Sequence, residues 1–212
     1  MAIPSVTPPL ARRNRAGAQL LAFMAGVFLL AGAAFFLYLF FFTNTLPLGG
    51  PDMRSWQVSP DFTTISDGHY RWTISYETPV DGVYRGLVRH ATPDRMGLFP
   101  LISHDILVTS GDYADAQRVQ TSVDVLLHRF TWRAPAGGTL TGRINLLHTV
   151  PYSPEIYQQL LQIRPGDQVV ITGREVARIN AFDLKANRDI GYWQDDGCNT
   201  LVVTGVEWIK NQ

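Results

Sequence analysis

The chain has 212 residues, and its 18 Lys and Arg balance its 18 Asp and Glu, so the formal net charge at pH 7 is zero. From Asp52 onward, 15 basic residues face 18 acidic ones, and only Lys185 and Lys210 are lysines. Domains that bind nucleic acid normally carry clustered Lys and Arg. This composition excludes nucleic acid as an expected partner. Cys198 is the single cysteine, which excludes an internal disulfide.

The segment Leu20 to Phe42 contains 23 consecutive residues without a charge. As a helix it would extend about 34 Å, which exceeds the roughly 30 Å of a bilayer's hydrocarbon core. The pattern predicts a transmembrane helix over residues 16–42, with the lipid bilayer as a partner. The residues expected to anchor it in lipid are Leu20, Phe23, Phe28, Leu37 and Phe42.

Charge on the two sides of this segment predicts its orientation. Arg12, Arg13 and Arg15 precede it, and the first ionisable residue after it is Asp52. The positive-inside rule therefore places the N-terminus in the cytoplasm and the C-terminal domain in the periplasm, as a single-pass protein of a bacterial inner membrane. A cleaved signal peptide ending near the small residues 31–33 is the alternative. Cleavage there would leave a strongly apolar new N-terminus, which favours the uncleaved anchor.

Small residues recur every four positions within the predicted span, at Ala18, Ala22 and Gly26. This spacing lets two membrane helices approach closely, so it indicates a homodimer contact. Residues 1–15 are expected to be a disordered cytoplasmic tail, and 43–54 a linker that contains Pro and Gly. Residues 55–212 are long enough for one core and are expected to form a single periplasmic domain.

Alternating apolar and polar residues predict the first strand of that domain at Arg71 to Glu77. The turn residues Pro79 to Gly82 follow, and then a second predicted strand from Val83 to His90. Two strands separated by a short turn indicate a hairpin. We therefore expect these two segments to pair with each other.

Further along the chain, Asp105 to Thr109 predicts a short buried strand, and Gly111 to Ala116 predicts a turn or brief helix. The segments His128 to Arg133 and Gly142 to Leu147 predict another strand pair. Two more strands are expected at 168–174 and 199–209. Strands therefore dominate the predicted domain.

One helix is expected after Ser153, whose side chain can accept a hydrogen bond from the first turn, with Pro154 at the first helical position. Ile156, Leu160 and Ile163 would share its buried face. The overall pattern indicates a mainly β (α+β) domain. The expected form is a small OB-like or SH3-like barrel, or a barrel-like sheet, with one or two short helices.

One set of segments is considered together: 84–88, 105–111 with 113–115, 130–133, 148–151, 165–173 and Gly197 with Cys198. In combination they resemble a family of single-pass bacterial envelope proteins of the inner membrane, whose outer domain is β-rich and OB-like. The resemblance implies this architecture and topology, and it implies no activity.

Candidate polar sites are few. His148 and Cys198 could form a polar site if folding brought them together, although a catalytic thiol also needs a positive environment. A metal site made of His104, Asp105, Asp112 and Asp115 has spacings that match no ligand template. The sequence therefore predicts no catalytic residues, no metal and no cofactor. Isolated histidines at 69, 90 and 128 are expected to be surface groups.

Three functions remain open. The leading expectation is a non-enzymatic, membrane-anchored module that docks a protein partner of the envelope. The second is an OB-like module that binds an oligosaccharide or envelope polymer, which would require aromatic rings along one groove. The third is a hydrolase that uses Cys198 or a carboxylate. The five tryptophans could line such a groove, but they are more simply explained as filling a core.

Overall fold

A computed structural model describes residues 15–38, 53–93, 99–124, 127–135, 139–194 and 197–210. The chain divides into two compact units, residues 1–39 and 40–212. The first contains the helix α1 (Arg15–Tyr38), and the second is a mainly β domain. The mainly β character predicted for the C-terminal part is therefore confirmed.

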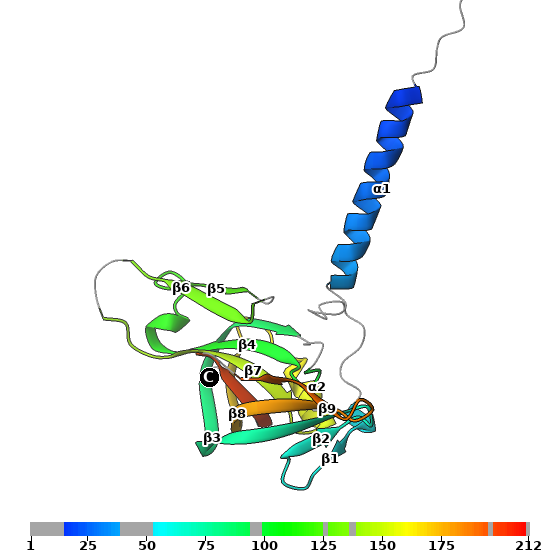
Figure 1. Cartoon of the computed structure of the whole chain (residues 1–212). Helices are drawn as coiled ribbons and strands as arrows, with labels where there is room; N and C mark the ends of the chain where they lie inside the picture. The colour runs from blue at the N-terminus through cyan, green and yellow to red at the C-terminus, as the bar shows by residue number, and fades with distance from the viewer. Residues whose placement is uncertain are drawn as a thin grey trace, which may run out of the picture. The chain divides into compact units, whose positions relative to one another are not determined.

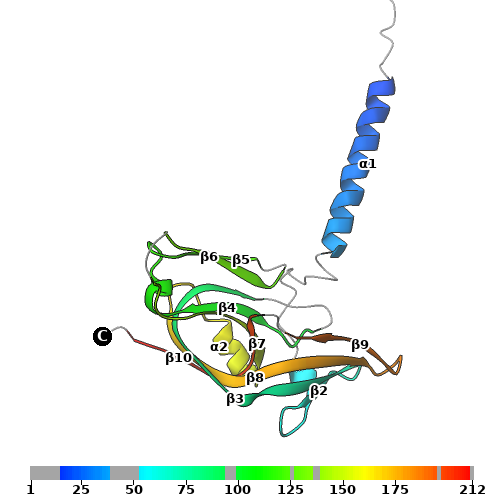
Figure 2. The same ribbon diagram turned by 60° about the vertical axis from the view of Figure 1, so that its left-hand side comes forward.

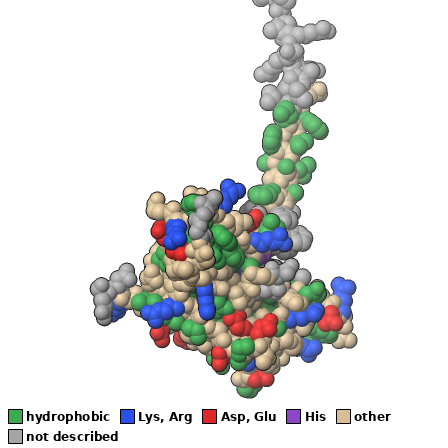
Figure 3. All heavy atoms as spheres, turned by 90° about the vertical axis from the view of Figure 1, so that its left-hand side faces the viewer, with side chains coloured by type: hydrophobic (Ala, Val, Ile, Leu, Met, Phe, Trp, Pro, Cys, Tyr) green, Lys and Arg blue, Asp and Glu red, His purple; other side chains and the backbone are tan. Residues whose placement is uncertain are grey.

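Large apolar side chains cover the described surface of α1, where Phe23 and Phe28 are both exposed. Figure 3 shows hydrophobic side chains along this helix and charged side chains spread over the β domain. Among the residues described, no helix meets the requirements of length and apolarity for crossing a membrane. Several of the residues named in the predictions have side chains or positions outside the described part of the chain: Arg12, Arg13, Arg15, Ala18, Leu20, Ala22, Leu37 and Phe42.

The β domain is organised around a ring of five strands (Figure 1). Each strand of the ring pairs with the next, and the pairing of β3 with β8 closes it. β7 and β10 run parallel, whereas the other pairs are antiparallel. In order around the ring, the strands are β3 (Tyr70–Pro93), β4 (His104–Thr109), β7 (Ile144–Pro151), β10 (Asn199–Trp208) and β8 (Gln168–Asp183).

The remaining elements extend this ring. β1 (Gln57–Val58) and β2 (Thr64–Ser66) continue the sheet beyond β3, and β9 (Arg188–Trp193) continues it beyond β8. β5 (Gln120–Asp124) and β6 (Arg129–Arg133) form a separate two-stranded sheet that lies above β4 in both ribbon views (Figure 2). Short 3-10 turns occupy Met53–Ser55 and Gly111–Ala114.

The predicted hairpin between residues 71–77 and 83–90 is wrong. Both segments belong to the single strand β3, and both pair with β8. The register moves from the pair Tyr76 and Val176 to the pair Asp81 and Arg174, so the residues between Tyr76 and Asp81 form a bulge. The turn residues therefore bend one long strand around the ring rather than reversing the chain.

The predicted pairing of segments 128–133 and 142–147 is also wrong. β6 pairs with β5 instead, and β7 pairs with β4 and β10. β7 is buried along most of its length, so its position is decided by the core it fills. The mostly exposed strand β6 stays outside the ring.

The predicted helix is confirmed as α2 (Pro154–Leu160), with the Ser153 side chain accepting a hydrogen bond from the Ile156 backbone N–H. Its apolar residues pack into one of two buried clusters, together with the β7 and β10 residues of the ring. The second cluster contains Trp72, Ile74 and Ile179 and lies between β3, β8 and the segment around Phe99. On β4 and β7, a row of polar residues lies on the face opposite to Ile106 and Leu147, which belong to the first cluster.

Candidate metal centre

A row of polar side chains crosses four neighbouring strands of the ring. Register places Thr92 of β3 opposite Asp105 of β4, Asp105 opposite His148 of β7, and His148 opposite Thr200 of β10. Directly opposed residues share one face of a sheet. The row is thus a direct consequence of strand pairing.

Asp105 is the centre of this row, and its side chain is fully buried. Nδ1 of His148 lies 2.7 Å from Oδ1 of Asp105, and Nδ1 of His128 lies 3.3 Å from Oδ2. Burial by itself raises the pKa of Asp105, but the hydrogen bonds with the two histidines outweigh it, and the resulting pKa is below the usual value. The site therefore presents a buried carboxylate between two imidazoles.

His128 reaches this centre from outside the ring, because it lies in the turn between β5 and β6. Its backbone adopts the left-handed conformation, with φ of 50°, which costs energy in a residue other than glycine. The backbone carbonyl of His128 accepts a weak hydrogen bond from Sγ of Cys198, at 3.7 Å. The side chain is 14% exposed, against 1% for His148, so the edge of the site nearest solvent is at His128.

Trp193 of β9 packs against both imidazoles. Its ring is nearly perpendicular to those of His128 and His148, at centroid distances of 5.6 and 5.2 Å. The indole Nε1–H donates to the Thr200 hydroxyl at 2.8 Å, which fixes the indole in place. Trp193 therefore limits the orientations that the two imidazoles can adopt.

The three side chains can each present one ligand atom to a metal ion. Those atoms, from Asp105, His128 and His148, all lie within 4.8 Å of one another. A tetrahedral ion with bonds of about 2.0–2.1 Å needs its ligand atoms about 3.3 Å apart. Nδ1 of His128 already lies at this spacing from Oδ2 of Asp105, at 3.3 Å, whereas the 2.7 Å between Nδ1 of His148 and Oδ1 would have to lengthen. Small side-chain adjustments would therefore accommodate an ion.

Two imidazoles and one carboxylate favour Zn²⁺ or Fe²⁺ over Ca²⁺ or Mg²⁺, because the latter prefer oxygen ligands. Three protein ligands also leave a coordination position for water or another ligand. The negative charge of Asp105 supplies electrostatic attraction for a cation in a buried environment. This arrangement is suited to holding a divalent transition metal.

Two other histidines flank the centre without belonging to it. His90 contacts the Thr92 hydroxyl at 2.7 Å through Nε2, and burial lowers the pKa of His90 although the charge of Asp105 opposes this. The ring of His104 lies 5.8 Å from that of Tyr157. Burial lowers the pKa of His104 to about 4, and in the described part of the chain its Nε2 has no hydrogen-bond partner.

The four residues weighed as a metal group from the sequence do not assemble. Asp112 instead pairs with Arg118 and accepts hydrogen bonds from Thr141, and Asp115 accepts one from the backbone of Gln117. Asp105 alone of the four belongs to the observed centre. His148 and Cys198, the residues expected to form a polar site, both border His128.

The prediction that His128 is a surface group is wrong, because its turn folds onto Asp105. Sequence reasoning missed this centre, although one signal was available. Asp105 and His148 each lie next to large aliphatic residues in a strand that is buried along most of its length. A charged or polar residue in such a strand normally requires a partner.

The five tryptophans do not line one groove. Trp72 is fully buried, Trp56 and Trp193 pack against the same core, and Trp132 and Trp208 are exposed on different strands. Trp72, Trp56 and Trp193 thus belong to a core, as the simpler expectation held, whereas Trp132 and Trp208 do not.

Comparison with protein-family models, with curated proteins and with solved structures finds no match for the chain. The function of the domain is therefore inferred from the geometry of the site.

Proposed function

We propose that the β domain binds a divalent transition-metal ion, with Zn²⁺ as the reference ion, through Asp105, His128 and His148. The observation that carries this proposal is the convergence of three ligand atoms, from three separate segments, within 4.8 Å of one another. A hydrogen-bonded network without metal is the competing explanation. It predicts the same contacts between the residues but no saturable affinity for the ion.

The energetics support a cation at this position. A buried carboxylate needs either a positive partner or strong hydrogen-bond donors. Neutral imidazoles can donate to Asp105, and they can also turn their nitrogen lone pairs to a metal once the protons leave. Trp193 already constrains both rings, so the entropy lost on binding would be small.

The test is Zn²⁺ titration of the full-length protein in detergent, by calorimetry or by competition with a chromophoric chelator. We expect one ion per chain. His128→Gln and His148→Gln should each lower the affinity for Zn²⁺ more than about 100-fold. Loss of a residue that only supports a metal ligand typically costs about 10–100-fold, and loss of the ligand itself should cost more.

The matched control is His69→Gln, because His69 is exposed and distant from Asp105 in the sheet. Its affinity should equal that of the wild type. Circular dichroism would establish that each variant is folded. Absence of saturable binding, or wild-type affinity in both ligand variants, would contradict the proposal.

We further propose that the N-terminal helix anchors this domain in a bacterial inner membrane, with the domain in the periplasm. The uncharged run of residues 20–42 and the exposed apolar side chains of α1 support this, since such side chains need an apolar environment. An epitope fused after Gln212 should be cleaved by protease added to spheroplasts. A protected epitope would contradict the orientation.

Self-association through Ala18, Ala22 and Gly26 is a second proposal about this helix. A side chain added at Gly26 meets nothing within 4 Å in the single chain, so a larger residue fits the isolated helix but would separate two close-packed helices. Gly26→Leu should weaken the signal in a membrane two-hybrid assay. An unchanged signal would remove the homodimer from consideration.

The closed ring of five strands supports describing the domain as a small OB-like barrel. Docking of an envelope protein is compatible with metal binding and stays a proposal. A hydrolase built on Cys198 receives less support. Its thiol donates to a backbone carbonyl, which does not activate a thiol as an imidazole base would.

A further inference from the structure

A second group of polar residues lies on the outer face of the sheet, where β3, β8 and β9 are neighbours. Register places Thr73 opposite Asn180 and Asn180 opposite Tyr192, so the three form one row across the strands. A pocket of about 400 Å³ opens over this row. It is lined by Thr73, Arg178, Asn180, Asp189, Gly191 and Tyr192.

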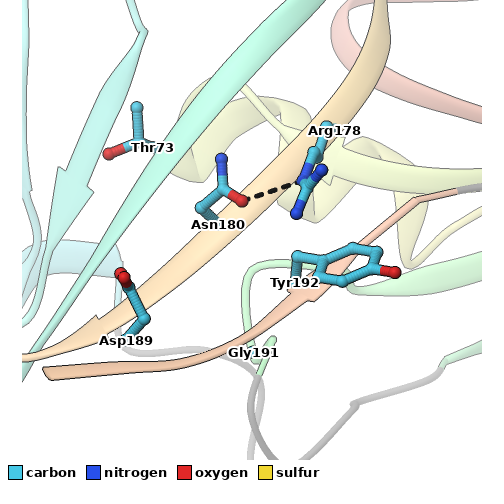
Figure 4. A pocket seen from close by; sticks show the side chains of 6 residues that line it. All are labelled: Thr73, Arg178, Asn180, Asp189, Gly191 and Tyr192. Carbon is cyan, nitrogen blue, oxygen red and sulfur yellow. Dashed lines mark hydrogen bonds between the residues drawn. The ribbon is translucent and has the colours of Figure 1, made fainter.

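The hollow results from an irregularity in β9. The register shifts between Ala181 and Phe182, which places Ile190 as an extra residue that packs against the core. Gly191, with φ of 148°, then contributes no side chain between Asp189 and Tyr192. Figure 4 shows Asn180 in the middle, with Asp189 on one side and Tyr192 on the other.

One side of the pocket is pre-organised. The Arg178 guanidinium lies over the Tyr192 ring, 3.9 Å from its centroid, and Nε of Arg178 donates to Oδ1 of Asn180 at 2.9 Å (Figure 4). These contacts hold both side chains in place before any ligand arrives. Tyr192 is nevertheless 58% exposed, so much of its surface can still contact a ligand.

Opposite to this pair, the pocket offers uncommitted hydrogen-bonding groups. The Asp189 carboxylate and the Thr73 hydroxyl have no side-chain partner within the described part of the chain. The amide nitrogen of Asn180 adds a donor, and the guanidinium of Arg178 adds more. One carboxylate and one guanidinium leave the lining close to neutral.

This combination selects a class of ligand. Asp189 disfavours a phosphate or another polyanion, Arg178 disfavours a simple cation, and the polar lining disfavours an apolar molecule. A sugar ring has hydroxyl groups that both donate and accept, and it has an apolar face that can lie against an aromatic ring. The volume is within the range of about 300–1,000 Å³ that is typical of small-molecule sites.

We infer that this pocket binds a neutral or zwitterionic sugar unit of an oligosaccharide. We call it the saccharide pocket, and the residues that form it are Thr73, Arg178, Asn180, Asp189 and Tyr192. The inference does not depend on the metal centre. Tyr192 contacts one ring face of the sugar, while Asn180 and Asp189 bind its hydroxyl groups.

The test uses labelled full-length protein in detergent on an array of oligosaccharides built from hexoses, N-acetylhexosamines and uronic acids. The best-bound neutral or zwitterionic oligosaccharide is then titrated by calorimetry. Tyr192→Ala should lower its affinity about tenfold through the lost aromatic contact, and Asn180→Ala and Asp189→Asn should each lower it several-fold.

Trp132→Ala is the control, because Trp132 is an exposed aromatic residue on β6, outside the pocket. It should bind like the wild type. The inference would be overturned if the wild-type protein bound no oligosaccharide on the array more strongly than the Tyr192→Ala variant does. Binding restricted to uronic acid chains, lost in Arg178→Gln and strengthened in Asp189→Asn, would also overturn it, because the site would then recognise an anion.

Discussion

The metal centre and the saccharide pocket are both rows of cross-strand neighbours on one sheet, yet they differ in how solvent reaches them. Asp105 in the first is fully buried and held by two imidazoles, whereas Asp189 in the second is exposed and has no side-chain partner among the described residues. Burial makes a charge costly unless it is compensated, while exposure leaves it free to exchange partners. Similar strand geometry can therefore produce both a closed cluster of polar side chains and an open polar pocket.

The largest expected difference between the two regions is in how much the loss of their carboxylate lowers the stability of the protein. Asp105→Ala should lower the free energy of unfolding by about 3 kcal/mol, because it removes the shared partner of the buried His148 imidazole and the half-buried His128 imidazole. Asp189→Ala should change it by less than about 0.5 kcal/mol. Urea unfolding of the full-length protein without added metal measures both. Equal effects would show that the two carboxylates are not distinguished by burial.

A change in the ring itself should affect both regions together. Gly173 lies where β8 meets β3 and β10, and a side chain there would collide with the backbone carbonyl of Val202. Gly173→Ala should therefore lower the free energy of unfolding by about 2 kcal/mol. The exposed Val83→Ala on neighbouring β3 is the control and should be close to neutral. A neutral Gly173→Ala would mean that the ring relaxes more easily than its packing indicates.

Adjacent residues of β9 allow the two regions to be separated. Trp193 packs on the imidazoles of the metal centre, and Tyr192 lines the saccharide pocket. Trp193→Phe should lower Zn²⁺ affinity about tenfold by loosening both imidazoles, and it should leave sugar binding unchanged. Tyr192→Ala should lower the affinity for the sugar and leave the affinity for Zn²⁺ unchanged. Parallel titrations with Zn²⁺ and with the selected oligosaccharide would detect any coupling, which would contradict independent sites.

The smallest expected effect comes from a substitution outside both regions, at the cap of α2. Ser153→Ala removes the hydrogen bond that caps α2 and should lower the free energy of unfolding by about 1 kcal/mol. Affinity for Zn²⁺ and for sugar should not change, because α2 contacts β7 and β10 at the other buried cluster. Thermal unfolding and the two titrations check this. Altered affinity would show that helix stability is transmitted to a site.

Local sequence signals predicted what depends on local contacts. The cap at Ser153 and the alternation that begins at Arg71 are properties of neighbouring residues, and both correspond to observed elements. The false hairpin has a different cause. Both segments of β3 pair with β8, about a hundred residues later, and nothing in the intervening turn residues reveals that distant partner.

The metal centre was missed for a similar reason. Its residues are 23 and 43 positions from Asp105, and His128 arrives through a turn of a hairpin outside the ring. The saccharide pocket depends on the bulge at Ile190, which periodicity does not reveal. Charged residues in apolar strands predict that partners exist, but they do not identify those partners.

The place of β10 in the ring has a consequence for biosynthesis. This strand comes last in the chain and inserts between β7 and β8, so both have unpaired edges until it is made. Unpaired edges invite association with other chains. A ribosome-stalled or C-terminally truncated product ending before Asn199 should therefore aggregate or be degraded. Synthesis of β10, rather than emergence of the earlier strands, therefore sets the moment at which the ring can close.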